Sequence, residues 1–254
     1  MSTTASVLSQ FADGIDFILH ERESRAGGAS VGGSQYLDLT WEHVKLSLAA
    51  MGVACAVSIP IGLWLGHIGR GQFLAITVSN VGRAVPSLAL IAFFVAYLGV
   101  GFTNVTLALV LLAIPPILTN SYVGVRQVDR DTVDAARGMG MSGNQIVRRI
   151  ELPLALPLIF GGVRTSAVNV VATATIAPLA GVVTLGDPII NFSVYGDDGR
   201  LGAAILVALL AVATELSLSA VQRAVTPKGL KLEAGAPLRR ARFPFPKRRV
   251  EATP

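Results

Sequence analysis

The chain has 254 residues, of which 52% are hydrophobic and 15% are charged, and its mean hydropathy is +0.60. A soluble domain carries about a quarter of its residues as Asp, Glu, Lys or Arg, so this chain has too few charges to cover its own surface in water. The composition therefore excludes an ordinary soluble domain. The net charge of +5 does not indicate nucleic acid, because the charges avoid long stretches of the chain.

Five apolar segments follow a polar start, and each has the roughly 20 residues that a helix needs to cross a bilayer. They are residues 44–68, 73–98, 103–122, 157–185 and 201–221. Together they hold only four charged side chains, those of Lys45, Arg83, Arg164 and Glu215. A helix satisfies its own backbone in lipid, so the sequence predicts an all-α integral membrane protein with five transmembrane helices.

Two of these charges need an explanation. Arg164 and Glu215 each lie about two turns from the predicted cytoplasmic face, from which an arginine can extend to the headgroups. An acid within a membrane helix indicates either a functional site or a hydrogen bond to a neighbouring helix. The sequence leaves both interpretations of Glu215 open.

Positive charge between the segments favours one side of the membrane as the cytoplasm. Fifteen Lys and Arg side chains lie on the side that holds residues 123–156 and the C-terminus, against three on the other side. Cytoplasmic loops are enriched in Lys and Arg, so we expect the N-terminus outside and the C-terminus inside the cell membrane. Residues 1–43 are then an extracytoplasmic N-terminal segment, residues 44–221 the transmembrane domain, and residues 222–254 a basic cytoplasmic tail.

Residues 123–156 form the one long loop, and its first half carries the signals of a short helix. Asp131 is a suitable N-cap for a helix over residues 132–139, with Asp134 at the position of a capping box. Gly140 suits the left-handed conformation that commonly ends a helix. The sequence thus predicts a helix that ends at a glycine turn.

The second half of the loop predicts another short helix. Ser142 is its expected N-cap, with Gln145 at the capping-box position, and Pro153 is expected to stop it. The small Ala135 and Ala136 of the first helix would let the resulting hairpin approach another protein closely. A hairpin that rests on the lipid headgroups fits the same residues equally well.

The loop resembles the EAA signature of the permease subunits of ABC importers. The usual pattern is Glu-Ala-Ala, three residues, Gly, nine residues, Ile, one residue and Leu-Pro. The matching residues are Asp134, Ala135, Ala136, Gly140, Ile150, Leu152 and Pro153. The single departure is Asp134 in place of Glu, which shortens the side chain and keeps its charge.

In that family the loop is a coupling helix that docks in a groove of a separate ATP-binding subunit. The resemblance implies this role for residues 131–153. The implied partners are two ATP-binding subunits, a second permease chain that is identical or related, an extracytoplasmic solute-binding protein and membrane lipid. The chain contains no G-x-x-x-x-G-K-[ST] phosphate-binding motif, so we expect ATP to be used by the partner subunit. We expect no enzymatic activity and no bound cofactor, metal or nucleic acid in this chain.

Further blocks resemble permeases for quaternary-amine osmoprotectants, which handle glycine betaine, choline, carnitine or proline betaine. These blocks are Val85 to Leu90, Ile114 to Leu118, Gly162 to Thr165, Ala172 to Thr175, and Gly186 to Pro188. The resemblance implies a compatible solute as cargo. A permease for another small solute, such as an amino acid or another cation, is the alternative. A membrane-embedded enzyme and a passive channel are more remote alternatives.

The fourth apolar segment is the best candidate for a translocation path. Thr165, Asn169, Thr173 and Thr175 place hydroxyls and an amide in an otherwise apolar stretch, and the first three share one helix face. Tyr97, near the end of the second segment, offers a ring for cation–π attraction to a quaternary ammonium. Aromatic residues make up only 6% of the chain. We therefore expect tight recognition in the binding protein and weak sites along the permease.

Overall fold

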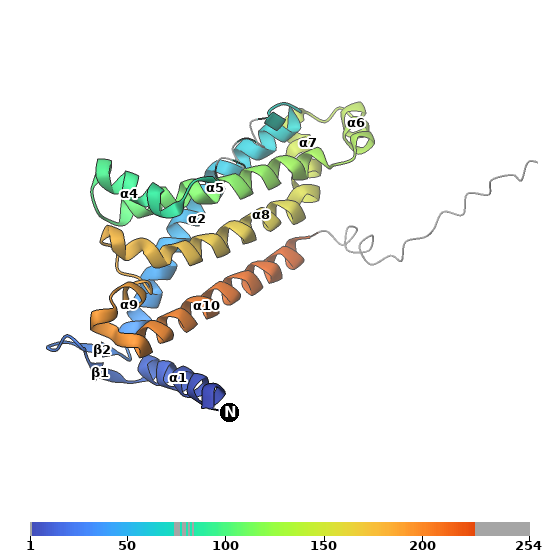
Figure 1. Cartoon of the computed structure of the whole chain (residues 1–254). Coiled ribbons are helices and arrows are strands. Elements are labelled where there is room, and N and C mark those ends of the chain that lie inside the picture. Colours follow the sequence, from blue (N-terminus) through green and yellow to red (C-terminus); the bar gives the residue numbers. More distant parts are fainter. Residues whose placement is uncertain (1, 74–76, 78–79, 81, 83, 227–254) are drawn as a thin grey trace, which may run out of the picture.

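The computed structural model describes residues 2–73, 77, 80, 82 and 84–226. Figure 1 shows long helices that run side by side as a bundle, with short elements at both of its ends. The chain starts with helix α1 (Ser2–Leu19) and an antiparallel hairpin of strands β1 (Glu21–Glu23) and β2 (Ser30–Gly32), followed by α2 (Gln35–His67). The later elements are α4 (Ser87–Leu98), α5 (Phe102–Arg126), α6 (Arg130–Gly138), α7 (Gly143–Ile146), the π-helical turn η1 (Val147–Glu151), α8 (Leu152–Thr173), the 3-10 helix η2 (Ala174–Ala180), α9 (Asp187–Ile190) and α10 (Phe192–Val225).

Four described helical segments are long and apolar enough to cross a membrane. They are Gln35–His67, Phe102–Arg126, Gly143–Ala180 and Phe192–Val225. The prediction of long apolar helices is thus confirmed for four of the five apolar segments, each of which contributes to one candidate span. The remaining one, residues 73–98, lies partly outside the described residues, and its described end forms the shorter apolar helix α4. Most of the predicted basic tail, residues 227–254, also lies outside them.

The first spanning helix begins earlier than its apolar segment. Helix α2 starts at Gln35 and crosses the predicted boundary between residues 43 and 44. Its first turns are amphipathic: Tyr36 and Leu39 are buried, whereas Asp38 is exposed. Hydropathy placed the boundary too late, because the charged side chains of these turns lie on the outer face of the helix.

The fourth apolar segment is not one continuous α-helix as predicted for residues 157–185. Helix α8 ends at Thr173, and η2 follows as far as Ala180, after which Gly181 has a φ of 75°. Pro178 has no backbone N–H, and its ring would clash with the carbonyl four residues earlier in an α-helix. The proline therefore accounts for the loss of α-helical geometry in this stretch.

Helix α5 packs against both α2 and α8 in the core of the bundle. The main buried cluster includes Leu46, Ala50, Val105, Leu109, Ile117, Ile159 and Val170. Glycines bring the backbones close: a Cβ on Gly62 would lie 2.9 Å from the carbonyl oxygen of Leu118, and one on Gly162 would lie 2.6 Å from that of Pro116. Small residues at such contacts are typical of helices that associate in a membrane.

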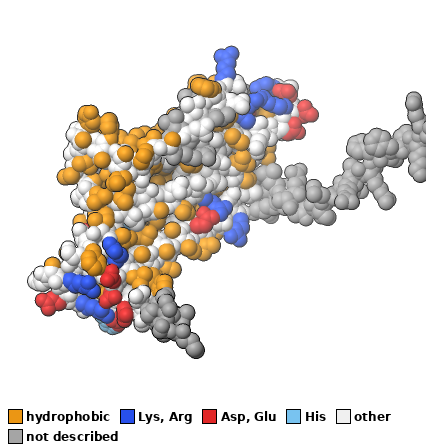
Figure 2. All heavy atoms as spheres, in the orientation of Figure 1, with side chains coloured by type: hydrophobic (Ala, Val, Ile, Leu, Met, Phe, Trp, Pro, Cys, Tyr) orange, Lys and Arg blue, Asp and Glu red, His pale blue; other side chains and the backbone are white. Residues whose placement is uncertain are grey.

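The two ends of the bundle differ. At one, called here the hairpin end, α1, the hairpin and the starts of α2 and α10 enclose Phe17, Tyr36, Leu185 and Tyr195. The other, called here the coupling end, holds α6, α7 and the last turns of α2 and α5. Figure 2 shows charged side chains gathered mainly at these two ends, with hydrophobic side chains over much of the flank between them.

Candidate functional site

The segment that carries the EAA-like residues, called here the coupling segment, comprises α6, α7 and η1. Its first helix is capped by Asp129, whose side chain accepts a hydrogen bond of 3.0 Å from the backbone N–H of Asp131. The prediction of Asp131 as the N-cap was therefore wrong by two residues. Asp129 has the extended backbone that a cap requires, and Asp131 lies in the first turn, where its charge favours the helix dipole. Asp134 does not form a capping box, and it pairs with Arg137 at 3.3 Å.

The glycine turn after α6 is confirmed. Gly140 has a φ of 81°. Its N–H donates to the carbonyl of Arg137 at 2.9 Å, and the N–H of Met141 donates to the carbonyl of Ala136 at 3.1 Å. This pair of bonds is the Schellman motif, which ends a helix through a residue in the left-handed conformation.

The second helix of the coupling segment starts as predicted but does not end at Pro153. Ser142 and Gln145 form the capping box at the start of α7. At Pro153 the prediction was wrong, because α7 continues through η1 into α8. The N–H of Leu152 donates to the carbonyl of Val147, five residues earlier, and such π-helical turns let a helix tolerate a proline without breaking. The second half of the coupling segment, α7 and η1, is thus continuous with the membrane-spanning helix α8.

The EAA-like residues divide into buried and outward-facing positions. Ala136 is fully buried in a small cluster with Val133 and Ile146, against which Ile150 packs. Leu152 packs against the main core of the bundle. Pro153 is half-buried at the start of α8. The exposed residues are Asp134, Ala135, Met139 and Gly140, which give the segment an outer face.

The predicted path residues of α8 lie beside two hollows. Thr165 and Asn169 line a groove of about 640 Å³ between α8 and α10, called here the α8–α10 groove. Asn169 and Thr173 line a hollow of about 270 Å³ that also includes Pro115 and Pro116 of α5. The structure therefore brings Thr165, Asn169 and Thr173 onto one face, with Asn169 shared by both hollows.

Hydrogen bonding separates Asn169 from the threonines. The hydroxyl of Thr165 donates to the carbonyl of Gly161 at 3.0 Å, and that of Thr175 donates to the carbonyl of Ala172 at 2.6 Å. The side-chain amide of Asn169 forms no hydrogen bond within the described part of the chain. Its exposed amide is thus available to a solute or to water.

Thr175 and Tyr97 lie outside both hollows. Thr175 belongs to η2. Tyr97 is 75% exposed near the end of α4, and its ring centroid lies 4.7 Å from that of Phe93. The two rings form an exposed aromatic pair on one face of α4.

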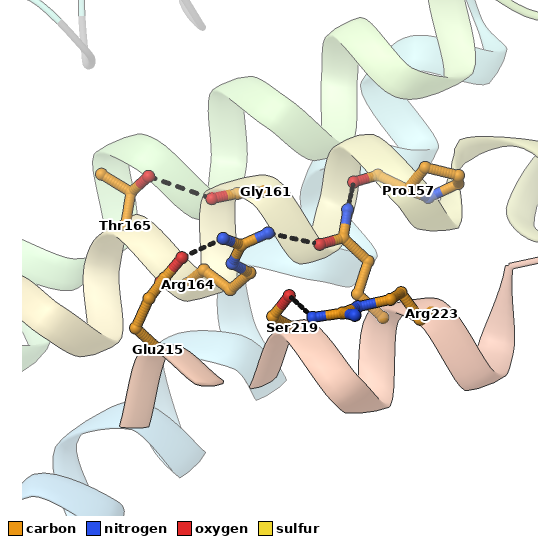
Figure 3. A network of polar contacts seen from close by, with 8 residues as sticks. Pro157, Gly161, Arg164, Thr165, Glu215, Ser219 and Arg223 are labelled. Atoms are coloured by element: carbon orange, nitrogen blue, oxygen red, sulfur yellow. Dashed lines mark hydrogen bonds and ion pairs between the residues drawn. The ribbon is translucent and has the colours of Figure 1, made fainter. Parts of the chain in front are cut away.

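A polar network between α8 and α10 was not predicted as such. The guanidinium of Arg164 donates to the carboxylate of Glu215 and, at 2.7 Å, to the side-chain oxygen of Gln222. Gln222 in turn donates to the carbonyl of Pro157 at 2.8 Å. Figure 3 shows Arg164 directed from α8 toward α10. Two opposite charges in different apolar segments were the only sequence signal for this pairing.

The described residues contain no candidate metal site. Within residues 2–73, 77, 80, 82 and 84–226, no three His, Cys, Asp or Glu side chains are grouped closely enough to hold a metal ion.

Known proteins resemble this chain in sequence and in fold. The family model of the binding-protein-dependent transport system inner membrane component matches residues 58–229. The carnitine transport permease protein OpuCB of Listeria monocytogenes is 39% identical over 200 residues, which cover 78% of this chain and 92% of that protein. The glycine betaine/carnitine/choline transport system permease protein OpuCB of Bacillus subtilis (strain 168) is 36% identical, with the same coverage.

Among solved structures, an inward-facing conformation of the MetNI methionine ABC transporter matches with a TM-score of 0.65 and 20% identity, over 76% of this chain and 96% of that one. At this identity the match shows the fold alone. The range matched by the family model includes the EAA-like segment, and the relatives are named as permeases. The chain accordingly belongs to the binding-protein-dependent inner membrane transport components, the permease subunits of ABC importers.

Proposed function

We propose that this permease carries a quaternary ammonium compatible solute, such as glycine betaine, choline, carnitine or proline betaine, into the cell. The observation that carries the proposal is the identity of 36–39% to permeases named for carnitine, choline and glycine betaine, over 92% of their length. The low content of aromatic residues supports a weakly polar path, because a tight site within a transporter would trap its cargo.

The outer face of the coupling segment is proposed to dock on an ATP-binding subunit, which uses the ATP. Asp134, Ala135 and Gly140 are exposed, while a separate buried cluster under them keeps the segment in shape. The continuous helix from α7 into α8 supports this role, since a rigid connection can carry a movement of the segment into the membrane. Two such subunits would serve two permease chains.

The proposed topology has five spanning helices, with the hairpin end outside the cell and the coupling end inside. The distribution of basic residues supports it: Arg126, Arg130, Arg137, Arg148 and Arg149 lie at or near the coupling end. Cytoplasmic loops are enriched in such residues. The hairpin end would then meet the extracytoplasmic solute-binding protein.

The polar face of α8 is proposed to line the translocation path, which a second permease chain completes. Thr165, Asn169 and Thr173 support this placement because they share a face beside two hollows. Thr175 in η2 and Tyr97 in α4 would belong to another part of this path. There the exposed ring of Tyr97 can attract a quaternary ammonium.

Uptake of radiolabelled choline and glycine betaine tests the proposal in a transport-deficient host that produces this chain with its ATP-binding subunit and binding protein. Ala135→Arg places a bulky side chain on the proposed docking face, and Ala135→Ser is the matched control. We expect uptake with the wild type and Ala135→Ser, and none with Ala135→Arg present at the same level in the membrane. Equal uptake with both variants would contradict the docking role. No uptake of either solute by an assembled, ATP-hydrolysing complex would contradict the proposed cargo.

A further inference from the structure

A buried contact at the coupling end joins two distant parts of the chain. Nδ1 of His67, in the last turn of α2, lies 2.8 Å from Oε2 of Glu151, the last residue of η1. The side chain of Glu151 is 5% exposed and that of His67 is 19% exposed. The two residues are 84 positions apart, so the contact is purely tertiary.

The position of Glu151 makes this contact more than local packing. Glu151 lies between the EAA-like residues Ile150 and Leu152, in the turn through which α7 continues into α8. The other ring nitrogen of His67 faces the start of α7, since a Cβ on Gly143 would lie 3.1 Å from Nε2. The ring of His67 therefore lies close to the first residue of α7 and contacts the last residue of η1.

The contact is costly to break because the carboxylate of Glu151 is buried. Glu151 has lost most of its water, and a buried carboxylate without a donor is strongly destabilising. Within the part of the chain that the structure describes, the ring of His67 is the only side chain that hydrogen-bonds to Glu151. Separating the two residues would leave the carboxylate unsatisfied, so the end of α2 is expected to follow the coupling segment when it moves.

We propose that His67 and Glu151 are positioning residues that tie α2 to the coupling segment, so that a displacement of the segment by the ATP-binding subunit moves α2 together with α8. The inference rests on the docking role proposed above. Helix α8 follows the segment through a continuous backbone. Without the His67–Glu151 contact, α2 would follow only through its packing against α5 and α8.

Hydrogen exchange on the purified complex with the ATP-binding subunit tests this link, because it reports the response of each segment separately. Exchange is compared before and after the complex is trapped with ATP and vanadate. His67→Ala removes the ring, whereas His67→Asn keeps an N–H donor at the δ position. His20→Ala is the matched control, since His20 also contacts an acid, Asp16, at 2.8 Å but is exposed at the hairpin end.

We expect trapping to change exchange by about threefold or more in residues 131–151 and in residues 60–67 of the wild type, His67→Asn and His20→Ala. In His67→Ala the change in residues 131–151 should remain, and that in residues 60–67 should fall by at least half. Should His67→Ala not fold, the double variant His67→Leu/Glu151→Leu replaces the buried pair by apolar side chains and should give the same loss.

Two results would overturn the inference while leaving the docking role intact. One is a change in residues 60–67 that is equally large without the ring, and the other is the absence of that change in the wild type. If the ATP-binding subunit does not alter exchange in residues 131–151 of the wild type at all, the docking role itself fails, and the inference fails with it.

Discussion

Arg164 of α8 and Glu215 of α10 form an ion pair on the flank of the membrane-spanning helices (Figure 3). The side chains are 30% and 38% exposed, and the groove beside them is lined mostly by apolar residues such as Val168, Val212 and Leu216. The apolar groove tolerates each charge mainly because the opposite charge lies beside it. The pair joins α10 to α8, together with the hydrogen bonds of Gln222.

Replacement of one partner should destabilise the chain more than replacement of both. Arg164→Met leaves the carboxylate of Glu215 without its cation in an apolar groove, whereas Arg164→Met/Glu215→Met leaves no charge. We expect the single variant to have a lower unfolding temperature in detergent and a lower level in the membrane, and the double variant to recover most of both. A double variant less stable than Arg164→Met would contradict this account.

The left-handed backbone at Gly140 should discriminate between substitution by Ala and substitution by Asn. A residue with a Cβ pays about 1–2 kcal/mol in this conformation, whereas Asn adopts it more readily. Gly140→Ala should therefore loosen the end of α6, seen as faster hydrogen exchange in residues 130–146, and weaken binding of the ATP-binding subunit. Gly140→Asn should stay close to the wild type. Indistinguishable Ala and Asn variants would show that the Schellman turn does not matter for docking.

The neighbouring residues Ala135 and Ala136 should respond differently to the same change. Ala136 is fully buried, so Ala136→Leu overpacks the cluster under α6 at a cost of about 1–3 kcal/mol and should loosen the segment in the isolated chain. Ala135 is exposed, so Ala135→Leu should leave exchange in the isolated chain unchanged and weaken only the binding of the ATP-binding subunit. Titration calorimetry and hydrogen exchange measure the two effects. A reversal of the two patterns would contradict the assignment of the outer face.

Asn169 should matter for the passage of solute rather than for assembly. Its amide is the polar group shared by both hollows, so Asn169→Leu should lower the rate of choline uptake by about tenfold, which corresponds to about 1.4 kcal/mol in the barrier. Asn169→Gln keeps an amide and should retain more activity, and Val212→Leu in the same groove is the apolar control. Unchanged uptake with Asn169→Leu would remove this face of α8 from the path.

Local signals in the sequence were informative where the structure depends on neighbouring residues. The capping box of Ser142 and Gln145 and the left-handed Gly140 are both present, because each depends on side chains or backbone within a few positions. Hydropathy likewise located four spanning helices. The error at Pro153 has a different origin, since the π-helical turn that accommodates the proline is not visible in any single residue preference.

Tertiary contacts could not be derived in this way. The sequence identified Arg164 and Glu215 as unusual charges, but nothing in the spacing of the two residues shows that their helices are neighbours. The same holds for His67 and Glu151, whose contact forms only because the ends of α2 and η1 meet in space. The separation of Ala135 from Ala136 into an outer and a buried position required the packing of α6 on α7.

The most direct test of the central claim is choline and glycine betaine uptake into proteoliposomes that contain this permease with its ATP-binding subunit and binding protein. The account predicts uptake that requires ATP on the side of the coupling end and stops when the ATP-binding subunit cannot hydrolyse ATP. Uptake that proceeds equally without ATP would indicate a passive channel and contradict the account.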